Sequence, residues 1–282
     1  MAITGKAALD DSVAAEVVEA LMVPELRPAF TGWRSFIRFA VGGNSTVASF
    51  ALWGDPGAAA APGDDLTEIT STALSDSQVS ATAAEVGFRV DVSDLIRETH
   101  ASDVYAVAAG MCSKAIQEKY ETDIAAMMDD FTSNSNTTTA SSTLTPSDLL
   151  SAMSALEQRD IPKPYVAYLD PKQTGELRDE IAFSTATLAT GGDAVQPFGD
   201  SGWFTTYMGL PIWQSSLTVT TSGLVGGAVF AANQALGIYE IRGPRVETQR
   251  DASYRTLEFV GSAAYGLAEI SDTRGQTLKS AA

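Results

Sequence analysis

The longest uninterrupted helical pattern in the chain runs from residue 103 to residue 131. Apolar side chains recur there every three or four positions, and the segment contains no proline and only one glycine. Two adjoining stripes comprise Val104, Val107, Ala108, Met111 and Ala115, and Cys112, Ile116, Tyr120, Ile124, Met127, Met128 and Phe131. Ser102 stands before them as a candidate N-cap. A helix of this length would extend on the order of 40 Å, which predicts a spine for the molecule.

Residues 1–30 carry an apolar repeat of four and end in Pro24 and Pro28, which predicts a short amphipathic helix in an N-terminal arm. Such a helix cannot form a core alone, so we expect it to dock either on its own body or on a neighbouring subunit. Residues 30–41 and 46–52 are aromatic or apolar and predict strands.

Two further runs, 66–74 and 79–92, predict a β-hairpin with Ser75–Asp76–Ser77 between its strands. In the second run, Val86, Phe88, Val90 and Val92 alternate with small or charged residues, which is the period of a half-buried strand. The far part is small and polar, so the hairpin is expected to project from the body. Residues 93–99 predict a helical turn, and the Ser/Thr/Asn-rich segment 132–145 predicts a loop.

The second half of the chain predicts a compact α/β unit followed by strands, and the whole chain an α+β fold. Thr145 and Pro146 suit the N-cap and first position of a helix that ends near Asp160. A helix starting at Asp170-Pro171 is expected to follow a short strand. Strands are predicted at 165–169, 211–213, 216–221, 228–232, 238–250, 256–262 and 265–270, with a glycine-rich loop at 185–202 and breaks at Gly243–Pro244 and Asp251–Ser253.

Charge and composition disfavour several classes of protein. The 282 residues include 35 Asp and Glu against 18 Lys and Arg, a formal net charge of −17. A general nucleic-acid binder would need a basic patch to neutralise phosphates. No apolar run reaches the roughly 20 residues of a membrane span, so no membrane partner is expected. Copies of this chain repel one another, so an assembly would depend on apolar, shape-matched contacts.

No group of residues has the spacing of a catalytic, cofactor or metal site, and none is predicted. His100, the only histidine, is expected to be solvated or to cap a helix. Cys112, the only cysteine, lies on the apolar face and is interpreted as a buried structural thiol. Gly223–Gly227 lacks the ending of a phosphate loop. Gly63-Asp64-Asp65 is interpreted as a coincidental match to a metal motif, and Asp129–Asp130 as a solvated helix end.

The order of these elements resembles the major capsid protein of tailed bacteriophages, whose Hong Kong 97-type fold is shared with encapsulin shell proteins. The resemblance covers nearly the whole chain. It is carried by Tyr207-Met-Gly-Leu-Pro-Ile-Trp213 with Ser215–Ser216, by Gly237 to Ile270 with its Val-Glu-x-x-Arg-Asp and Tyr-Gly elements, and by TPSDLLSAMSALEQRDIPKPYVAYLDP from Thr145 onward. It implies an N-terminal arm at 1–40, an E-loop at 41–92, a peripheral P domain at 93–145 and 238–282 with the spine helix 103–131, and an axial A domain at 146–237.

The resemblance also implies a function. The chain would be a major capsid subunit without enzymatic activity, forming the pentamers and hexamers of an icosahedral virion head that encloses double-stranded DNA. Its partners would be copies of itself, separate scaffolding and portal proteins and a candidate cement protein, with DNA enclosed without sequence-specific binding and assembly in the host cytoplasm. Two alternatives stay open: an encapsulin-type nanocompartment shell, and a soluble α+β enzyme with an unrecognised site.

One departure from the family changes an expectation. Some related capsids crosslink an E-loop lysine to a neighbouring asparagine, whereas residues 41–92 contain no lysine. We therefore expect a non-crosslinked shell, held by non-covalent burial or by a cement protein. No long scaffolding region precedes the arm, so either a separate scaffolding protein or a cleaved prodomain is expected, and Met1 favours the former. An acidic lumen would let packaged DNA slide.

Overall fold

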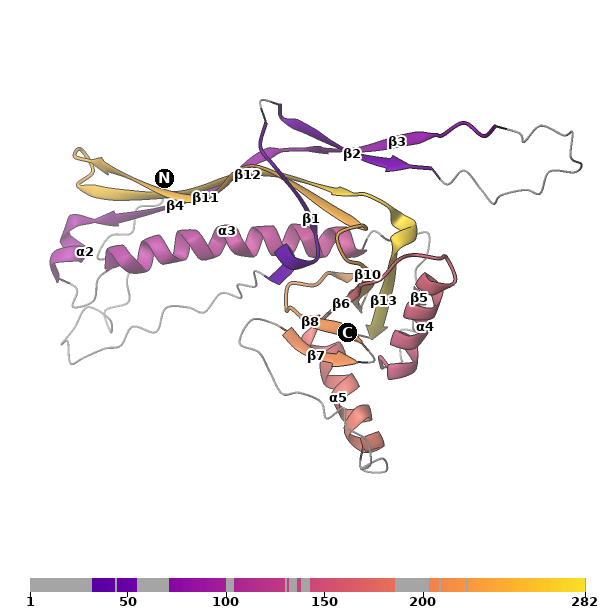
Figure 1. Ribbon diagram of the computed structural model, residues 1–282. Coiled ribbons are helices and arrows are strands. Elements are labelled where there is room, and N and C mark those ends of the chain that lie inside the picture. Colours follow the sequence, from indigo (N-terminus) through magenta and orange to yellow (C-terminus); the bar gives the residue numbers. More distant parts are fainter. Residues whose placement is uncertain are drawn as a thin grey trace, which may run out of the picture.

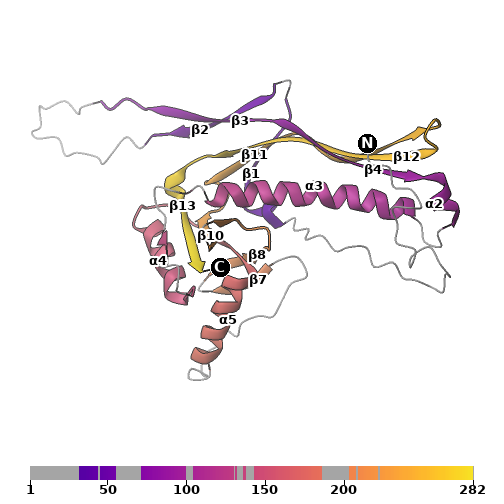
Figure 2. The same cartoon turned by 180° about the vertical axis from the view of Figure 1, so that it is seen from behind.

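The computed structural model describes residues 32–43, 45–54, 71–99, 104–129, 131, 136–137, 143–185, 203–207, 209–221 and 223–281. Within these residues, a long sheet lies along one helix, and a second lobe of strands and helices lies below one end of that layer (Figure 1). A two-stranded hairpin extends from the same end, past the second lobe (Figures 1 and 2). The predicted arm helix of residues 1–30 lies outside the described residues.

The first layer is a four-stranded sheet of order β1–β11–β12–β4. Its strands are β1 (Arg38–Val41), β4 (Ala84–Ser93), β11 (Leu236–Asp251) and β12 (Thr256–Glu269). β12 lies antiparallel between β11 and β4, and β1 adds to β11 in parallel. The period-two prediction for 86–92 is confirmed, because Val90 and Val92 pack with Cys112 and Phe259 between this sheet and the helix below.

The predicted spine is confirmed as helix α3 (Val104–Asp129), 26 residues long. Its buried face packs on β12, where Tyr120 stacks on Tyr265 with ring centroids 3.8 Å apart. Gly261 of β12 lies directly over the helix, because a side chain there would place its Cβ 3.2 Å from the Cβ of Cys112. The helix therefore holds the long sheet along most of its length, and the short helix α2 (Asp94–Thr99) precedes it as predicted.

The second lobe is a seven-stranded sheet whose main path is β5–β13–β10–β6–β8–β7. Its strands are β5 (Asn136–Thr137), β6 (Tyr165–Leu169), β7 (Trp203–Tyr207), β8 (Leu210–Gln214), β9 (Thr220–Thr221), β10 (Leu224–Ala231) and β13 (Gly275–Ala281). Helices α4 (Pro146–Glu157) and α5 (Pro171–Thr185) flank it (Figure 1). Thr145 takes the predicted N-cap position of α4 with Pro146 next to it, and Asp148 accepts a hydrogen bond from the Thr145 backbone N–H at 2.9 Å.

The predicted pairing of the projecting hairpin is wrong. The structure pairs β2 (Val47–Trp53) with β3 (Asp76–Thr82), so Asp76 and Ser77 begin a strand and do not form a turn. Residues 79–92 run through two strands with different partners, because β3 pairs with β2 whereas β4, from Ala84, pairs with β12. The apolar alternation changes phase between them, at Ala83–Ala84. Alternating apolar residues indicate a strand but not the strand with which it pairs, and this is why the predicted pairing was wrong.

Several boundaries of the other predicted strands also need correction. Gly243–Pro244 does not break β11, which continues past two register shifts. β1 pairs with β11 only as far as Glu240, so Pro244 lies on a sheet edge, where its missing N–H costs no ladder bond. The predicted strands 256–262 and 265–270 are the single strand β12, and of 216–221 only Thr220–Thr221 is a strand. Of the described residues 32–41, only Arg38–Val41 is a strand, after a 3-10 turn at Gly32–Ser35.

The last strand was not predicted from the sequence. β13 pairs antiparallel with β10, from Leu224↔Ala281 to Phe230↔Gly275, and so belongs to the second sheet. The proposed P domain at 238–282 therefore ends in a strand that completes the sheet of the proposed A domain. The sheet of the second lobe therefore contains residues from both sides of a domain division at residue 237.

Candidate assembly surfaces

The residues with possible chemistry have structural roles where the structure describes them. Cys112 is fully buried, its thiol donates to the Phe259 carbonyl at 3.6 Å, and burial raises the pKa of that thiol. The interpretation as a structural thiol is confirmed. Asp129 forms an ion pair with Lys279 at 2.7 Å with both side chains largely covered, so a solvated helix end was the wrong interpretation of this residue.

The remaining motif candidates form no site among the described residues. Gly223 turns the chain at φ +76° into β10, and Gly226 and Gly227 lie inside that buried strand. His100, Asp130 and Gly63-Asp64-Asp65 lie outside the described residues. The described part of the chain contains no group of three or more His, Cys, Asp or Glu side chains that could hold a metal ion. None of its described helices is long and apolar enough to cross a membrane.

A buried polar contact fixes the second lobe against the spine. Glu121 of α3 is buried and accepts a hydrogen bond from the Tyr168 hydroxyl of β6 at 2.8 Å. Burial, together with the Glu121 charge, raises the pKa of Tyr168 well above its usual value. Phe36 packs beside this contact, with its ring centroid 6.0 Å from that of Trp213 and 5.6 Å from that of Phe230. The two lobes therefore meet through a filled core, which suits a rigid subunit.

The base of the projecting hairpin is anchored to the long sheet by a joint centred on Phe50. Phe50 is 3% exposed and packs with Tyr239 and Ala268. Its ring occupies the space above Gly237 of β11, because a Cβ at Gly237 would lie 2.8 Å from Phe50 Cζ. On β12, a Cβ at Gly266 would clash with the backbone carbonyl of Thr82. The two glycines let the hairpin cross the sheet at close range.

Hydrogen bonds complete this joint on the side of the β1–β2 connection. The Tyr239 hydroxyl donates to the Ser45 carbonyl at 2.6 Å and accepts from the Gly43 backbone N–H at 3.1 Å. The connection is thereby fastened to β11 on each side of residue 44. These contacts fix the direction in which the hairpin leaves the body.

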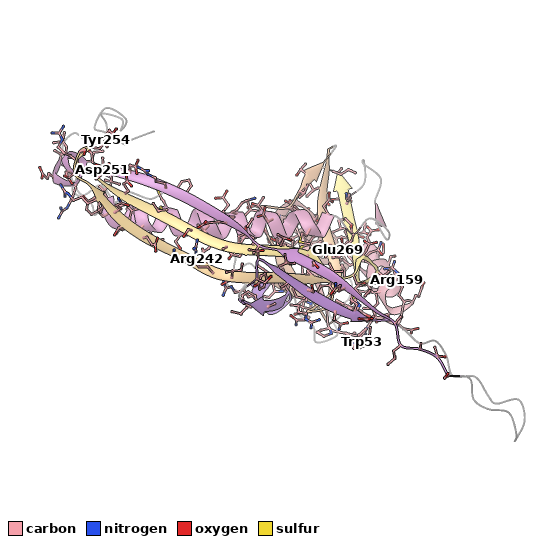
Figure 3. All side chains as sticks on the ribbon, turned by 90° about the horizontal axis from the view of Figure 1, so that it is seen from above. Trp53, Arg159, Arg242, Asp251, Tyr254 and Glu269 are labelled. Carbon is pink, nitrogen blue, oxygen red and sulfur yellow. The ribbon has the colours of Figure 1, made fainter. Side chains whose placement is uncertain are left out.

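Beyond the joint, the hairpin presents surface that a lone subunit does not cover. Trp53 is 72% exposed and Leu74 is 70% exposed, and both lie toward the hairpin's outer end. Figure 3 shows Trp53 at the end of the molecule opposite Tyr254. Two-stranded hairpins are marginally stable alone in water. A large exposed aromatic side chain on such a ribbon is typical of an interface anchor.

The outer face of the long sheet carries cross-strand ion pairs. Arg89 of β4 contacts Asp91 at 2.7 Å and Glu258 of β12 at 2.5 Å. Arg242 of β11 reaches Glu85 of β4 across β12. These arginines neutralise neighbouring carboxylates and support strand register. Their positive charge is already matched within the sheet, so this face is not arranged to bind phosphates.

The sequence model of the phage capsid protein family matches residues 76–276 of the chain. The chain belongs to this family. It is therefore a structural subunit of a capsid shell and not an enzyme, with the virion capsid as its location. No curated protein sequence matches it significantly.

Solved structures share the Hong Kong 97-type fold at low sequence identity. The capsid of cyanophage P-SCSP1u matches with a TM-score of 0.73 at 17% identity, covering 94% of this chain and 92% of that one. A structure from Mycobacterium phage Che8 matches with a TM-score of 0.69 at 18% identity, covering 93% and 96%. The SrpI encapsulin of Synechococcus elongatus matches with a TM-score of 0.63 at 14% identity, covering 96% and 94%. At such identities these likenesses show the fold alone.

Sequence reasoning missed the parts of the molecule that prepare it for contact with other copies. It predicted a projecting hairpin with the wrong strand pairing, and it missed the joint that aims the hairpin. The available signal was Gly237, because a glycine inside an apolar strand often marks a close approach of another chain segment. Tyr239, two residues later on the same side of β11, supplies the polar half of the joint.

Proposed function

We propose that copies of this chain form pentamers and hexamers that close an icosahedral head around double-stranded DNA. The observation that carries the proposal is the hairpin of β2 and β3, held at its base by Phe50 and projecting with Trp53 exposed. A projection on one side that meets a different surface of the next copy makes a heterologous contact, and such contacts form rings when the rotation between copies closes. The net charge of −17 requires that apolar contacts of this kind overcome repulsion between copies.

The division into domains belongs to this proposal. Residues 1–40 would be the arm, 41–92 the E-loop, 93–145 and 238–282 the P domain, and 146–237 the A domain. The hairpin of β2 and β3 lies within the proposed E-loop and supports that assignment. The pairing of β13 with β10 favours moving Gly275–Ala281 to the A domain.

The proposal also includes other partner proteins and a place of assembly, which rest on the resemblance to the family and not on a particular surface of this chain. Separate scaffolding and portal proteins would guide assembly in the host cytoplasm, and a cement protein is a further candidate partner. Acidic residues that line the lumen would keep packaged DNA from adhering to the wall. A reconstruction in which the inner surface is mainly basic would contradict that role for the charge.

An encapsulin-type nanocompartment is the second candidate function, favoured by the likeness to the SrpI encapsulin fold. The two functions differ in what the shell encloses. Particles should be purified, treated with nuclease, and then opened to recover their contents. A phage head is expected to protect double-stranded DNA, whereas particles that hold a folded protein cargo and no DNA would support the nanocompartment.

A further inference from the structure

The outer half of β11 is an open edge of the long sheet. β1 pairs with β11 only as far as Glu240, so within the described residues the stretch 241–251 has a strand partner on the β12 side alone. Figure 3 shows Arg242 and Asp251 along one long side of the sheet. Every residue from Pro244 to Arg250 is exposed. This strand therefore presents a row of backbone N–H and C=O groups to which another strand can pair.

Two features that protect edge strands, a proline and an irregular register, are confined to one end of this edge. Pro244 and two register shifts lie between Glu240 and Arg245. From Arg245 to Asp251 the strand faces β12 residue for residue without a further shift. A regular stretch of exposed edge therefore remains beyond the proline.

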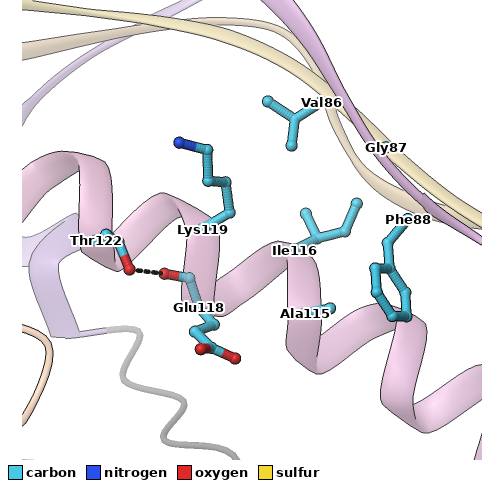
Figure 4. Close-up of a pocket in the computed structure, with 8 residues that line it drawn as sticks. All are labelled: Val86, Gly87, Phe88, Ala115, Ile116, Glu118, Lys119 and Thr122. Carbon is cyan, nitrogen blue, oxygen red and sulfur yellow. Dashed lines mark hydrogen bonds between the residues drawn. The ribbon is translucent and has the colours of Figure 1, made fainter.

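The opposite edge of the sheet is built differently. There, Val86 and Phe88 of β4 line a groove together with Ala115 and Ile116 of α3. The Phe88 ring is turned toward the helix (Figure 4). The β4 edge therefore packs on the spine, whereas no residue from Pro244 to Arg250 on β11 is buried. The more accessible side of this layer is the β11 side.

The charges of the β11 edge do not oppose a second copy. Residues 241–251 hold three arginines against one glutamate and one aspartate, in a chain whose net charge is −17. Arg242 and Arg250 are each paired with a carboxylate of their own chain. Most of the repulsion between copies therefore arises elsewhere on the molecule, and two copies can meet at this edge at low electrostatic cost.

The sequence of the edge is complementary to itself. In an antiparallel pair of identical strands with a two-fold axis at Val246, Glu247 of each copy lies opposite the partner's Arg245. Val246, which is 37% exposed, meets its own counterpart. An axis at Arg245 or at Glu247 would place like charges face to face. An axis at Thr248 would place the apolar Val246 opposite Arg250, so the side chains favour the axis at Val246.

We propose that the outer half of β11 pairs antiparallel with the same strand of a second copy, with Val246 on the two-fold axis. The pairing joins the two four-stranded sheets into one continuous sheet. This inference rests on the proposed assembly, because rings of five or six copies need a further contact to join into a shell. An icosahedral shell has two-fold axes, and a contact across such an axis uses the same surface of both copies.

The existing contact between Arg245 and Glu247 is compatible with this pairing. Within one chain the two side chains lie 3.3 Å apart and are 47% and 59% exposed. An exposed pair of this kind adds little to the stability of one subunit. A second copy brings one arginine and one glutamate together, so the group of four charges stays neutral and each guanidinium has a carboxylate on both strands.

The orientation of the pair also suits a shell wall. The two-fold axis of an antiparallel pair of this kind is perpendicular to the sheet, so both copies turn the same face of the sheet to the same side. Val246 lies on the face toward α3, because its register partner Gly261 lies over Cys112. Arg245 and Glu247 lie on the other face, since neighbouring side chains alternate along a strand.

A single cysteine tests the register. Residues directly opposite in an antiparallel pair have Cα atoms about 4.5–5.5 Å apart, which suits a disulfide. Shells of Val246→Cys are oxidised and run on a non-reducing SDS gel. We expect a dimer that reverts to monomer on reduction, because one new thiol joins two copies and the native Cys112 is buried.

Thr248→Cys is the matched control for the disulfide. Thr248 is exposed and lies on the same face of the strand as Val246. In the proposed register, four residues of strand separate it from its own counterpart, so the two Cα atoms would lie about 14 Å apart. Shells of this variant are expected to run as monomers. Val246→Cys shells that run as monomers, or a Thr248→Cys dimer of equal yield, would overturn the proposal.

A mixture of charge variants tests the contact without a new bond. Arg245→Glu and Glu247→Arg each place like charges opposite one another twice in every contact. Each alone is expected to raise the protein concentration needed for assembly by about tenfold or more. An equal mixture of the two is expected to recover most of that loss, because a copy with two glutamates then faces a copy with two arginines.

The mixture distinguishes a contact between copies from an effect within one chain. Mixing cannot restore the pair of residues 245 and 247 inside either variant, so recovery has to come from the partner strand. A mixture that assembles no better than either variant alone would contradict the pairing.

The outcomes also separate this inference from the proposed function. If wild-type protein forms shells but Val246→Cys shells give no dimer, only the inference fails, and another segment or another protein lies along the edge. If wild-type protein forms no shells under any condition, the proposed function fails, and the inference fails with it.

Discussion

The substitution Gly237→Ala tests whether the joint sets the direction of the hairpin. The added Cβ would lie 2.8 Å from Phe50 Cζ and 3.0 Å from each Cε of the same ring. Carbon atoms in contact normally stand about 3.5 Å apart or more, so the ring must move by about 0.7 Å. Phe50 is held by Tyr239, Ala268 and the strand partner of β2, and the ring cannot move without opening that cluster.

The expected loss of stability follows from this overpacking. Extra atoms in a filled core cost about 1–3 kcal/mol, and we place this substitution in the upper half of that range because three ring atoms are too close at once. Gly43→Ala is the matched control. It lies in the same joint, but its Cβ would meet its nearest neighbour, the Tyr239 hydroxyl, at 3.8 Å.

Hydrogen exchange of the unassembled subunit is the assay that resolves the effect. In Gly237→Ala, amides of β2 and β3 should exchange faster while those of α3 keep their protection, because the joint opens without unfolding the spine. Phe50→Ala alone should also loosen the hairpin by leaving a cavity. In the Phe50→Ala background, however, Gly237→Ala should cost little further stability. Additive losses in the double variant, or unchanged protection of β2 and β3 in Gly237→Ala, would refute the role of the joint.

Three further predictions concern the second lobe, the buried phenols and the covalent state of the shell. Gly227→Ala should lower the free energy of unfolding, measured by chemical denaturation, by about 2 kcal/mol or more, because its Cβ would lie 2.5 Å from Gln173 Oε1 and 3.0 Å from the Tyr168 carbonyl. Gly175→Ala is the control, because its Cβ would meet nothing within 4 Å. Equal losses in the two variants would contradict the reasoning. Burial raises the pKa of the Tyr120, Tyr168 and Tyr265 hydroxyls above the usual value of about 10. As the pH rises, the unfolded chain therefore loses these phenol protons before the folded chain does. Stability should be fully present below about pH 10 and fall as the pH rises further, and a flat profile to higher pH would contradict this. Denatured mature particles should give one capsid-subunit band on an SDS gel, since residues 41–92 contain no lysine, and a covalent ladder would overturn that expectation.

The features that the sequence predicted well depend on local patterns. The two apolar stripes predicted α3, because helical spacing is legible within one segment. Thr145 and Pro146 predicted the start of α4 for the same reason. The order of such elements was enough to recognise the capsid fold, which the family match and the solved structures support.

The features that the sequence did not predict depend on which segments meet. The apolar alternation of residues 79–92 changes phase at Ala83–Ala84, where the chain changes its strand partner, but the pattern does not say which strands pair. Gly243–Pro244 was predicted to break the strand because the sequence does not show that β1 stops pairing at Glu240, which leaves Pro244 at an open edge of β11. Strand β13 is short and carries Lys279, whose partner Asp129 lies about 150 residues earlier in the chain. Pairing energies of this kind come from tertiary context, which no local pattern contains.

The assembly surfaces belong to the same class of feature. Gly237 matters because Phe50 packs over it, and Gly266 matters because the backbone carbonyl of Thr82 lies close to it. Each depends on residues far apart in the sequence. Trp53 precedes a Gly/Ala/Pro-rich stretch in the sequence, but only the fold shows that it is exposed on a projecting ribbon.

Electron microscopy of the purified protein in negative stain tests the central claim most directly. A shell subunit whose rigid body and aimed hairpin prepare it for heterologous contacts should form closed particles with icosahedral symmetry from this chain, alone or with a scaffolding protein. Protein that stays monomeric at every concentration and salt condition, with and without such a partner, would contradict the claim.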